Sequence, residues 1–204
     1  MVSLLGNHGI IKNDYFKADV IHVVQQSDEI RHYITSHTTE IPNRSKIYCS
    51  LNQERRLINA RYHTAGHLLG NIVEILNPNL KAFKGHSFPG EAYVEFAQTS
   101  SITLFQGDDE VLNLTTLQNA IDKTIVRNDN TMVFDIAPEA FKAQFYKLPY
   151  SVPENKKFRA MRIGNMLPVP CGGTHLSYIG EIGNMKISKI KNKSNYMRIS
   201  YEVI

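Results

Sequence analysis

Several sequence features that mark particular classes of protein are scarce or missing in this 204-residue chain. It has only two cysteines, Cys49 and Cys171. That is too few for the disulfide framework of a small secreted domain, so we expect a reducing, cytoplasmic location. No run of 18 apolar residues occurs, which argues against a transmembrane helix and a membrane partner. The first residues also lack a basic segment followed by a long apolar core, so no signal peptide is expected.

The overall composition is that of an ordinary globular protein. Hydrophobic residues make up 42% and charged residues 21%, and the formal net charge is +4. Basic residues gather near the C-terminus, where no acidic residue lies between Glu181 and Glu202. This segment is either a solvated edge strand protected by lysines or a surface that contacts RNA phosphates. Its basic residues, our candidates for RNA binding, are Lys186, Lys189, Lys191, Lys193 and Arg198.

Hydrophobic periodicity predicts an α+β fold in which an antiparallel-rich sheet is packed by two long helices. The two helices are expected at about 52–76 and 111–127, and a short helix near 139–146. Residues 1–50 alternate apolar and polar in short runs and predict a small N-terminal β-unit, followed by a second domain at 51–204. Strands of the second domain are expected around 82–88, 92–96, 131–136, 158–163, 182–190 and 196–203.

Two short motifs carry the chemistry. His63 and His67 stand four residues apart on the first predicted helix, so their imidazoles share one face and can reach one metal ion. Downstream, Cys171 and His175 flank a Gly-Gly-Thr segment whose glycines permit a tight turn. Three imidazole nitrogens and one thiolate suit a tetrahedral zinc ion. We therefore predict one Zn²⁺ per chain.

Each motif alone is weak evidence, because a single histidine on a helix is usually an ordinary surface or core residue. Together they are expected by chance in roughly a few per cent of chains of this composition. Other zinc hydrolases fit poorly: a metalloprotease helix needs glutamate where Thr64 stands, and nucleobase deaminases need a second cysteine shortly after Cys171. Cys49 has no histidine at ligand spacing and is expected in the core.

The two motifs resemble those of a known family. His-Thr-Ala-Gly-His-Leu-Leu at 63–69, Pro-Cys-Gly-Gly-Thr-His-Leu at 170–176 and Glu-Ile-Gly at 181–183 are similar to the editing domain of alanyl-tRNA synthetase. They are closer still to the free-standing alanyl-tRNA editing proteins of the AlaX family. Threonyl-tRNA synthetase editing domains look like more distant relatives. The resemblance covers roughly residues 50–204 and implies the fold of these editing domains.

The chain departs from the family pattern in two places. Family members usually begin with a β-barrel that contains a Gly-Gly-Gln segment, so residues 1–50 look like a shortened version. Synthetase editing domains also carry Gln-x-Gly-Ser after the helix, whereas this chain reads Phe-Lys-Gly-His-Ser at 83–87. The role of the missing glutamine would then fall to His86 or Ser87, or be absent. Nothing in the sequence resembles an ATP site, so the resemblance implies a protein that acts in trans and without ATP.

The resemblance implies a zinc-dependent deacylase that hydrolyses the ester of tRNA(Ala) mischarged with serine or glycine. An apolar synthesis pocket discriminates weakly between amino acids that differ by one small group, so a second, hydrolytic site is useful. Zinc would orient the substrate or polarise a water. Backbone N–H groups of Gly172 and Gly173 are candidates for stabilising the oxyanion, and Thr64, Thr174 and His86 are further candidates at the site. We infer no obligate protein partner.

Two alternatives stay open at this point. A filled tetrahedral site is also what a structural zinc in a non-catalytic RNA-binding module would show. A zinc hydrolase acting on a small ester or amide is the third possibility. An open cleft beside the metal with basic surroundings would favour the deacylase, and a metal sealed in the core would favour the structural role.

Overall fold

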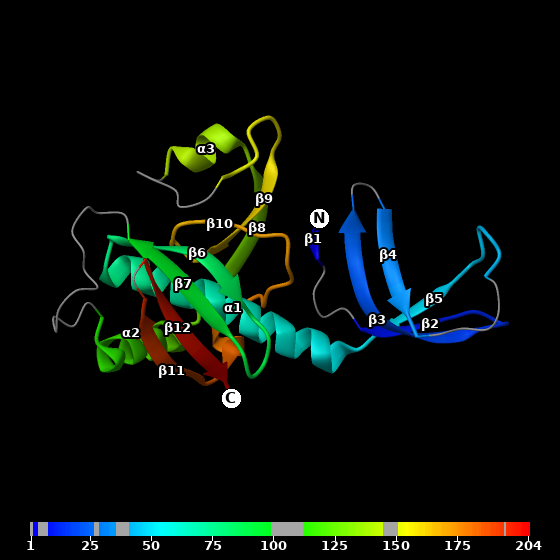
Figure 1. Cartoon of the computed structure of the whole chain (residues 1–204), viewed down its shortest axis with the longest axis horizontal. Helices are drawn as coiled ribbons and strands as arrows, with labels where there is room; N and C mark the ends of the chain where they lie inside the picture. The colour runs from blue at the N-terminus through cyan, green and yellow to red at the C-terminus, as the bar shows by residue number, and fades with distance from the viewer. Residues whose placement is uncertain are drawn as a thin grey trace. The chain divides into compact units, whose positions relative to one another are not determined.

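The computed structural model describes residues 2–3, 8–26, 29–35, 41–98, 112–144, 151–193 and 195–204. The chain forms two compact units, Met1–Asn59 and Ala60–Ile204. Helix α1 (Gln53–Leu76) begins in the first unit and continues into the second (Figure 1). The domain boundary expected between residues 50 and 51 stays a prediction. Among the described residues, no helix is long and apolar enough to cross a membrane.

The N-terminal unit is an antiparallel sheet. Its strands follow the order β1-β3-β2-β5, and β4 pairs with β3. Alternation places Ile11 and Ala18 in a small apolar core, while Lys12 and Lys17 are exposed. Cys49 is exposed on β5, so its expected place in the core was wrong; the strand is too short and too near the edge to bury it. The strands are β1 (Val2–Ser3), β2 (Gly9–Lys12), β3 (Lys17–Gln26), β4 (Glu29–Ile34) and β5 (Tyr48–Leu51).

The larger unit contains two antiparallel sheets. A four-stranded sheet has the order β11-β12-β7-β6, and a three-stranded sheet has the order β10-β9-β8. The first sheet comprises β6 (Leu80–His86), β7 (Tyr93–Gln98), β11 (Met185–Asn192) and β12 (Tyr196–Val203). The second comprises β8 (Thr131–Ile136), β9 (Phe158–Ile163) and β10 (Val169–Pro170). The remaining helices are α2 (Leu114–Arg127), α3 (Pro138–Lys142) and the 3₁₀ helix η1 (Ile179–Ile182).

Both long helices pack against the four-stranded sheet (Figure 1). Gly66 of α1 lies so close to β12 that a Cβ there would meet the Tyr201 hydroxyl at 2.7 Å. The Gln118 side chain of α2 bonds to β11 at both ends, donating to the Met185 carbonyl at 2.7 Å and accepting from the Ile187 N–H at 2.9 Å. The buried faces of α1 and of the sheet thus form the core that carries the site.

The structure confirms the α+β class. Asn113 caps α2, its side chain accepting from the Thr115 N–H at 2.7 Å, so the helix begins at Leu114 rather than near residue 111, which lies outside the described part. The last hairpin begins at Met185 because Ile179–Ile182 form a 3₁₀ turn. The short strand β10, which pairs with β9 and leads directly into Cys171, was not predicted from the sequence.

Candidate metal centre

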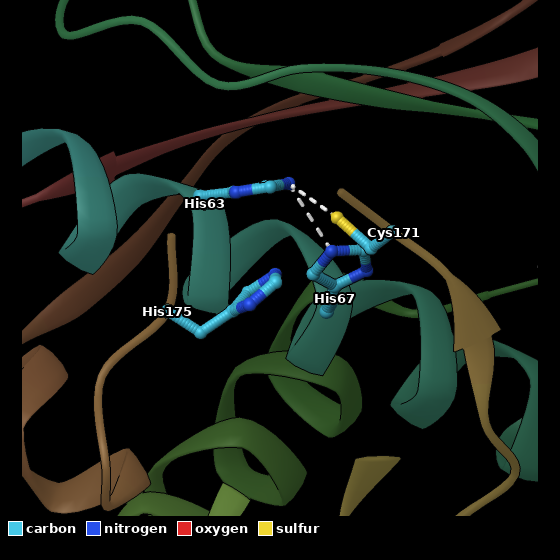
Figure 2. Close-up of side chains that lie close together, drawn as sticks. All are labelled: His63, His67, Cys171 and His175. Atoms are coloured by element: carbon cyan, nitrogen blue, oxygen red, sulfur yellow. Dashed lines mark hydrogen bonds between the residues drawn. The ribbon is translucent and has the colours of Figure 1, made fainter. Parts of the chain in front are cut away.

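Four side chains from two segments converge in the larger unit. His63 and His67 project from the same face of α1, and Cys171 and His175 come from the loop after β10 (Figure 2). Cys171 Sγ and His67 Nε2 each lie 3.2 Å from His63 Nε2. The candidate ligand atoms of all four residues lie within 4.8 Å of one another. The geometry therefore brings together the set that the sequence predicted.

Local packing fixes the orientation of His63. Its Nδ1 lies 3.2 Å from the Thr174 carbonyl, which favours the tautomer that donates there and leaves Nε2 facing the cluster. Gly173 packs directly on this ring, where a Cβ would meet His63 Cε1 at 2.1 Å. The Gly173 N–H is directed at Cys171 Sγ, 3.4 Å away. The Gly-Gly turn thus packs closely on His63 and donates a hydrogen bond to Cys171.

Thr64 connects the two ligand-bearing segments. Its buried hydroxyl accepts a hydrogen bond from the Leu176 N–H at 3.0 Å, and the Leu176 carbonyl accepts from Thr131 of β8. Arg159 of β9 holds the same loop by donating to the Gly173 carbonyl at 2.8 Å. Hydrogen bonds among helix, loop and sheet therefore hold together the two segments that carry the four side chains.

Burial sets the protonation of the cluster. Desolvation lowers the pKa of His67 well below its ordinary value, and that of His175 to about 3, and the neighbouring His63 adds to both effects. Desolvation also lowers the pKa of His63, although its bond to Thr174 opposes the shift. For Cys171, burial raises the thiol pKa, while the Gly173 N–H and Arg159 oppose the rise. The histidines are therefore held neutral, the form that ligates metals.

The donor set fits a metal ion. Both ring nitrogens of His175 are buried and have no hydrogen-bond partner among the described residues. Orphaned polar atoms of this kind are rare unless water or an ion completes them. Three imidazoles and one thiol in mutual reach make a group that could hold a metal ion, and nitrogen with sulfur donors favours zinc over magnesium or calcium.

A pocket of about 360 Å³ adjoins the cluster. His63, His67 and Cys171 line its wall. Gly70, Asn71 and Glu74, which continue the same face of α1, also line it, together with residues of β6. The cluster is therefore reached through an open pocket and is not sealed in the core.

Several known proteins are similar to this chain in sequence. Residues 159–199, which include Cys171 and His175, match the family described as the threonyl and alanyl tRNA synthetase second additional domain. The chain is 28% identical over 201 residues to the alanyl-tRNA editing protein AlaX-L of Pyrococcus horikoshii, a match that covers 96% of this chain and 46% of that protein. It is 25% identical over 197 residues to the alanine–tRNA ligase of Petrotoga mobilis, covering 95% of this chain and 22% of the ligase.

The resemblance to the alanyl-tRNA editing proteins is confirmed. The chain spans less than half the length of either relative.

Not every predicted site residue lies at the cluster. His86 is absent from the pocket wall; it stacks on Tyr93 with ring centroids 5.6 Å apart, and its Nε2 lies 3.4 Å from a carboxylate oxygen of Glu91. Thr64 is buried against Leu176 rather than exposed to the pocket, and Gly172 is exposed. Ser87, the alternative to His86, does line the pocket.

Asn71 and Glu74 are among the pocket residues that the sequence analysis missed. They follow His67 by four and seven residues, so the helical spacing that found the histidines could also have found them.

The basic residues of the C-terminal hairpin divide into two kinds. Lys186, Lys189 and Lys191 are exposed on edge strand β11, and Lys193 is exposed just beyond it. Arg198 is engaged within the fold: its Nε donates to buried Glu95 at 2.9 Å, and its guanidinium lies 4.1 Å from the centroid of the Tyr93 ring. The lysines are thus free to meet a phosphate surface, whereas Arg198 already has two partners.

Proposed function

We propose that this chain is a zinc-dependent deacylase that hydrolyses the ester of tRNA(Ala) mischarged with serine or glycine. The observation that carries the proposal is the open pocket whose wall includes His63, His67 and Cys171. A purely structural zinc needs no such opening, since structural sites are closed and fully ligated. The name of the AlaX-L relative supports alanyl-tRNA as the substrate class.

The reaction transfers the acyl group to water. Water adds to the ester carbonyl carbon, the bond from that carbon to the ribose oxygen breaks, and the oxygen leaves with a proton as the tRNA hydroxyl. His63, His67, Cys171 and His175 would hold the zinc ion. A bound zinc ion supplies positive charge that orients or polarises the ester.

The other residues of the pocket bind and orient. Gly66 has no side chain, which lets the Tyr201 hydroxyl and Ser87 approach the helix beside the ligands. Ser87 lines the same space, and the buried Tyr201 hydroxyl lies 3.5 Å from Ser87 Oγ. Ser87 can therefore offer a polar contact to a substrate hydroxyl or amine. The Gly173 N–H is already directed at Cys171 Sγ, which leaves the Gly172 N–H as the remaining predicted donor to the oxyanion.

The expected partner and location follow from the resemblance to the alanyl-tRNA editing proteins. The partner is tRNA(Ala) carrying serine or glycine, contacted in part by the lysines of the C-terminal hairpin. The cytoplasmic location is part of this proposal, because it rests on the translation-related relatives.

A deacylation assay tests the proposal. Ser-, Gly- and Ala-tRNA(Ala) are incubated side by side with zinc-loaded protein, with chelator-stripped protein, and with stripped protein to which zinc is restored. We expect hydrolysis of Ser- or Gly-tRNA(Ala), survival of Ala-tRNA(Ala), and loss and recovery of activity with the metal. A folded, zinc-loaded protein that leaves every mischarged tRNA(Ala) intact would refute the deacylase and favour the structural-zinc module.

A further inference from the structure

An irregularity in strand β6 lies at the wall of the pocket. The strand pairs with β7 in regular register up to Ala82, which faces Phe96, but Lys84 then faces Glu95, so Phe83 is the extra residue of a β-bulge. Bulges are frequent at sheet edges and beside functional sites, where they change the direction of a side chain. Here β6 is the edge strand, and the bulged residue lines the same pocket as His63 and His67.

The bulge is held in place by α1. At Ala82 the backbone N–H donates to Glu74 Oε1 at 3.0 Å, and Lys81 Nζ lies 3.0 Å from the other carboxylate oxygen. Glu74 and Lys81 are both about one-fifth exposed. One helix carboxylate therefore satisfies the N–H next to the bulge and also pairs with the neighbouring lysine. An anchored bulge of this kind presents Phe83 in a fixed place.

Phe83 is a large apolar side chain left unusually open. It is 37% exposed, although most phenylalanines are buried. Tyr196 packs against it, with the two ring centroids 6.3 Å apart in a T-shaped arrangement. An exposed aromatic residue that packs on a second ring and belongs to a pocket wall can offer an aromatic face to a flat ligand.

We propose that Phe83 is the stacking platform for the base of the tRNA's 3′-terminal adenosine. This inference rests on the proposed function and deepens it. Glu74, next to the bulge, stands seven residues and so about 10 Å along the helix axis from His67. One nucleoside spans that order of length, so an ester held at the metal ligands places its own base near Phe83. Aromatic side chains bind unpaired RNA bases by stacking.

The absence of tryptophan from the chain provides a direct probe. Phe83→Trp keeps an aromatic face and introduces the sole tryptophan. We expect its fluorescence to be quenched by uncharged tRNA(Ala) ending in CCA, and much less by the same RNA lacking the terminal adenosine. Val126→Trp, at an 84% exposed position of α2, is the matched control, and we expect it not to distinguish the two RNAs. Equal quenching of Phe83→Trp by both RNAs would overturn the inference.

Kinetics provide a second measurement on the full chain. Because Phe83 would stack on one base, Phe83→Ala and Phe83→Leu should raise KM for Ser-tRNA(Ala) by roughly 5- to 150-fold, with kcat much less affected. Phe83→Tyr and Phe83→Trp should retain a KM near that of the wild type. Phe83→Leu keeps an apolar side chain but has no aromatic face, so it distinguishes stacking from apolar packing. An unchanged KM in Phe83→Ala would refute the platform.

The two proposals fail differently. If the wild type deacylates Ser-tRNA(Ala) while Phe83→Trp does not sense the terminal adenosine, the platform is wrong and the deacylase stands. If Phe83→Trp senses the adenosine while the wild type hydrolyses no mischarged tRNA, the base site stands and the deacylase is wrong. Circular dichroism of each variant verifies that the comparison is made on folded protein.

Discussion

The hydroxyl of Thr64 accepts a hydrogen bond from the N–H of Leu176 at 3.0 Å, and Thr64 is fully buried. Thr64 follows His63 directly, and Leu176 follows His175 directly. This one bond therefore joins the helix that carries two of the ligands to the loop that carries the other two. Its position explains why a threonine inside the first motif belongs to the architecture of the metal centre and not to the pocket.

Thr64→Val should destabilise the protein and loosen the cluster. The valine keeps the volume but removes the acceptor, which leaves the Leu176 N–H buried and unpaired, at a loss of about 1–3 kcal/mol in the free energy of unfolding. Urea denaturation measures that loss, and competition with a chelator measures metal affinity. Thr64→Ser, which keeps the hydroxyl, should stay closer to the wild type. Equal stability of the Val and Ser variants would contradict the role of this bond.

Gly173→Ala should weaken metal binding without large global destabilisation. A Cβ at this position would lie 2.1 Å from His63 Cε1, so the imidazole has to move away from the cluster. Disturbing the support of a ligand typically reduces metal affinity by about 10- to 100-fold. The neighbouring Gly172→Ala, at an exposed position, is the matched control. If both variants bind zinc equally well in a chelator titration, the close packing on His63 does not matter for the site.

The four cluster residues could be predicted because their signals are local. A spacing of four on a helix fixes two imidazoles on one face, and two glycines permit the turn between Cys171 and His175. Local signals also explain why the helix predicted at about 52–76 agrees with α1, whose apolar face repeats over 24 residues from Gln53 to Leu76. Periodicity of this length is dictated by burial on one side.

What the sequence could not show depends on how one strand pairs with another in the sheet. His86 and Ser87 are adjacent, and only the register of β6 against β7 decides which of them faces the pocket. The bulge at Phe83 shifts that register within the strand and leaves no trace in the hydrophobic pattern. Arg198 looked like a free cation because its partner, Glu95, lies 103 positions away in the chain.

Tyr201→Phe should make stability less sensitive to alkaline pH. Burial raises the pKa of Tyr201 above its ordinary value of 10.0. A raised folded-state pKa means that its contribution is fully present below pH 10, and is lost as the pH rises further because the unfolded tyrosine ionises first. Urea midpoints of the wild type should therefore fall between about pH 10 and 11, with a slope of up to about 1.4 kcal/mol per pH unit from this group.

The phenylalanine variant loses the bond from the Tyr201 hydroxyl to the Tyr62 carbonyl, 2.8 Å in the wild type, so its stability at pH 8 should be lower. Its decline above pH 10 should nevertheless be shallower. Tyr15→Phe, at an 84% exposed position, serves as the control and should keep the slope of the wild type. Parallel pH profiles for the wild type and Tyr201→Phe would show that this hydroxyl does not govern the alkaline transition.

Charge reversal on β11 should weaken tRNA binding in a salt-dependent way. Lys189→Glu and Lys191→Glu each change an exposed lysine of the edge strand. Each lost phosphate contact should reduce the slope of log affinity against log salt by about one unit. Lys123→Glu makes the same charge change on the exposed side of α2 and should leave the slope unaltered. If all three variants behave alike, the lysines of β11 only protect a sheet edge.

Cys171→Ser distinguishes a metal ion that takes part in the reaction from one that only stabilises the fold. A neutral hydroxyl is a much poorer zinc ligand than a thiolate, so zinc affinity should fall. Deacylation of mischarged tRNA(Ala) should fall by at least about 100-fold, the scale of losing one well-placed electrostatic element.

The fold should largely survive the same substitution, because α1 and the four-stranded sheet pack through buried apolar residues such as Leu68, Phe96 and Ile199. Cys49→Ser, which changes the exposed cysteine of β5, is the matched control and should retain activity, zinc and melting temperature. A structural zinc predicts the opposite pattern, in which Cys171→Ser lowers the melting temperature sharply and the wild type hydrolyses neither Ser- nor Gly-tRNA(Ala). Activity, bound zinc and melting temperature measured on the three proteins therefore decide between the two roles.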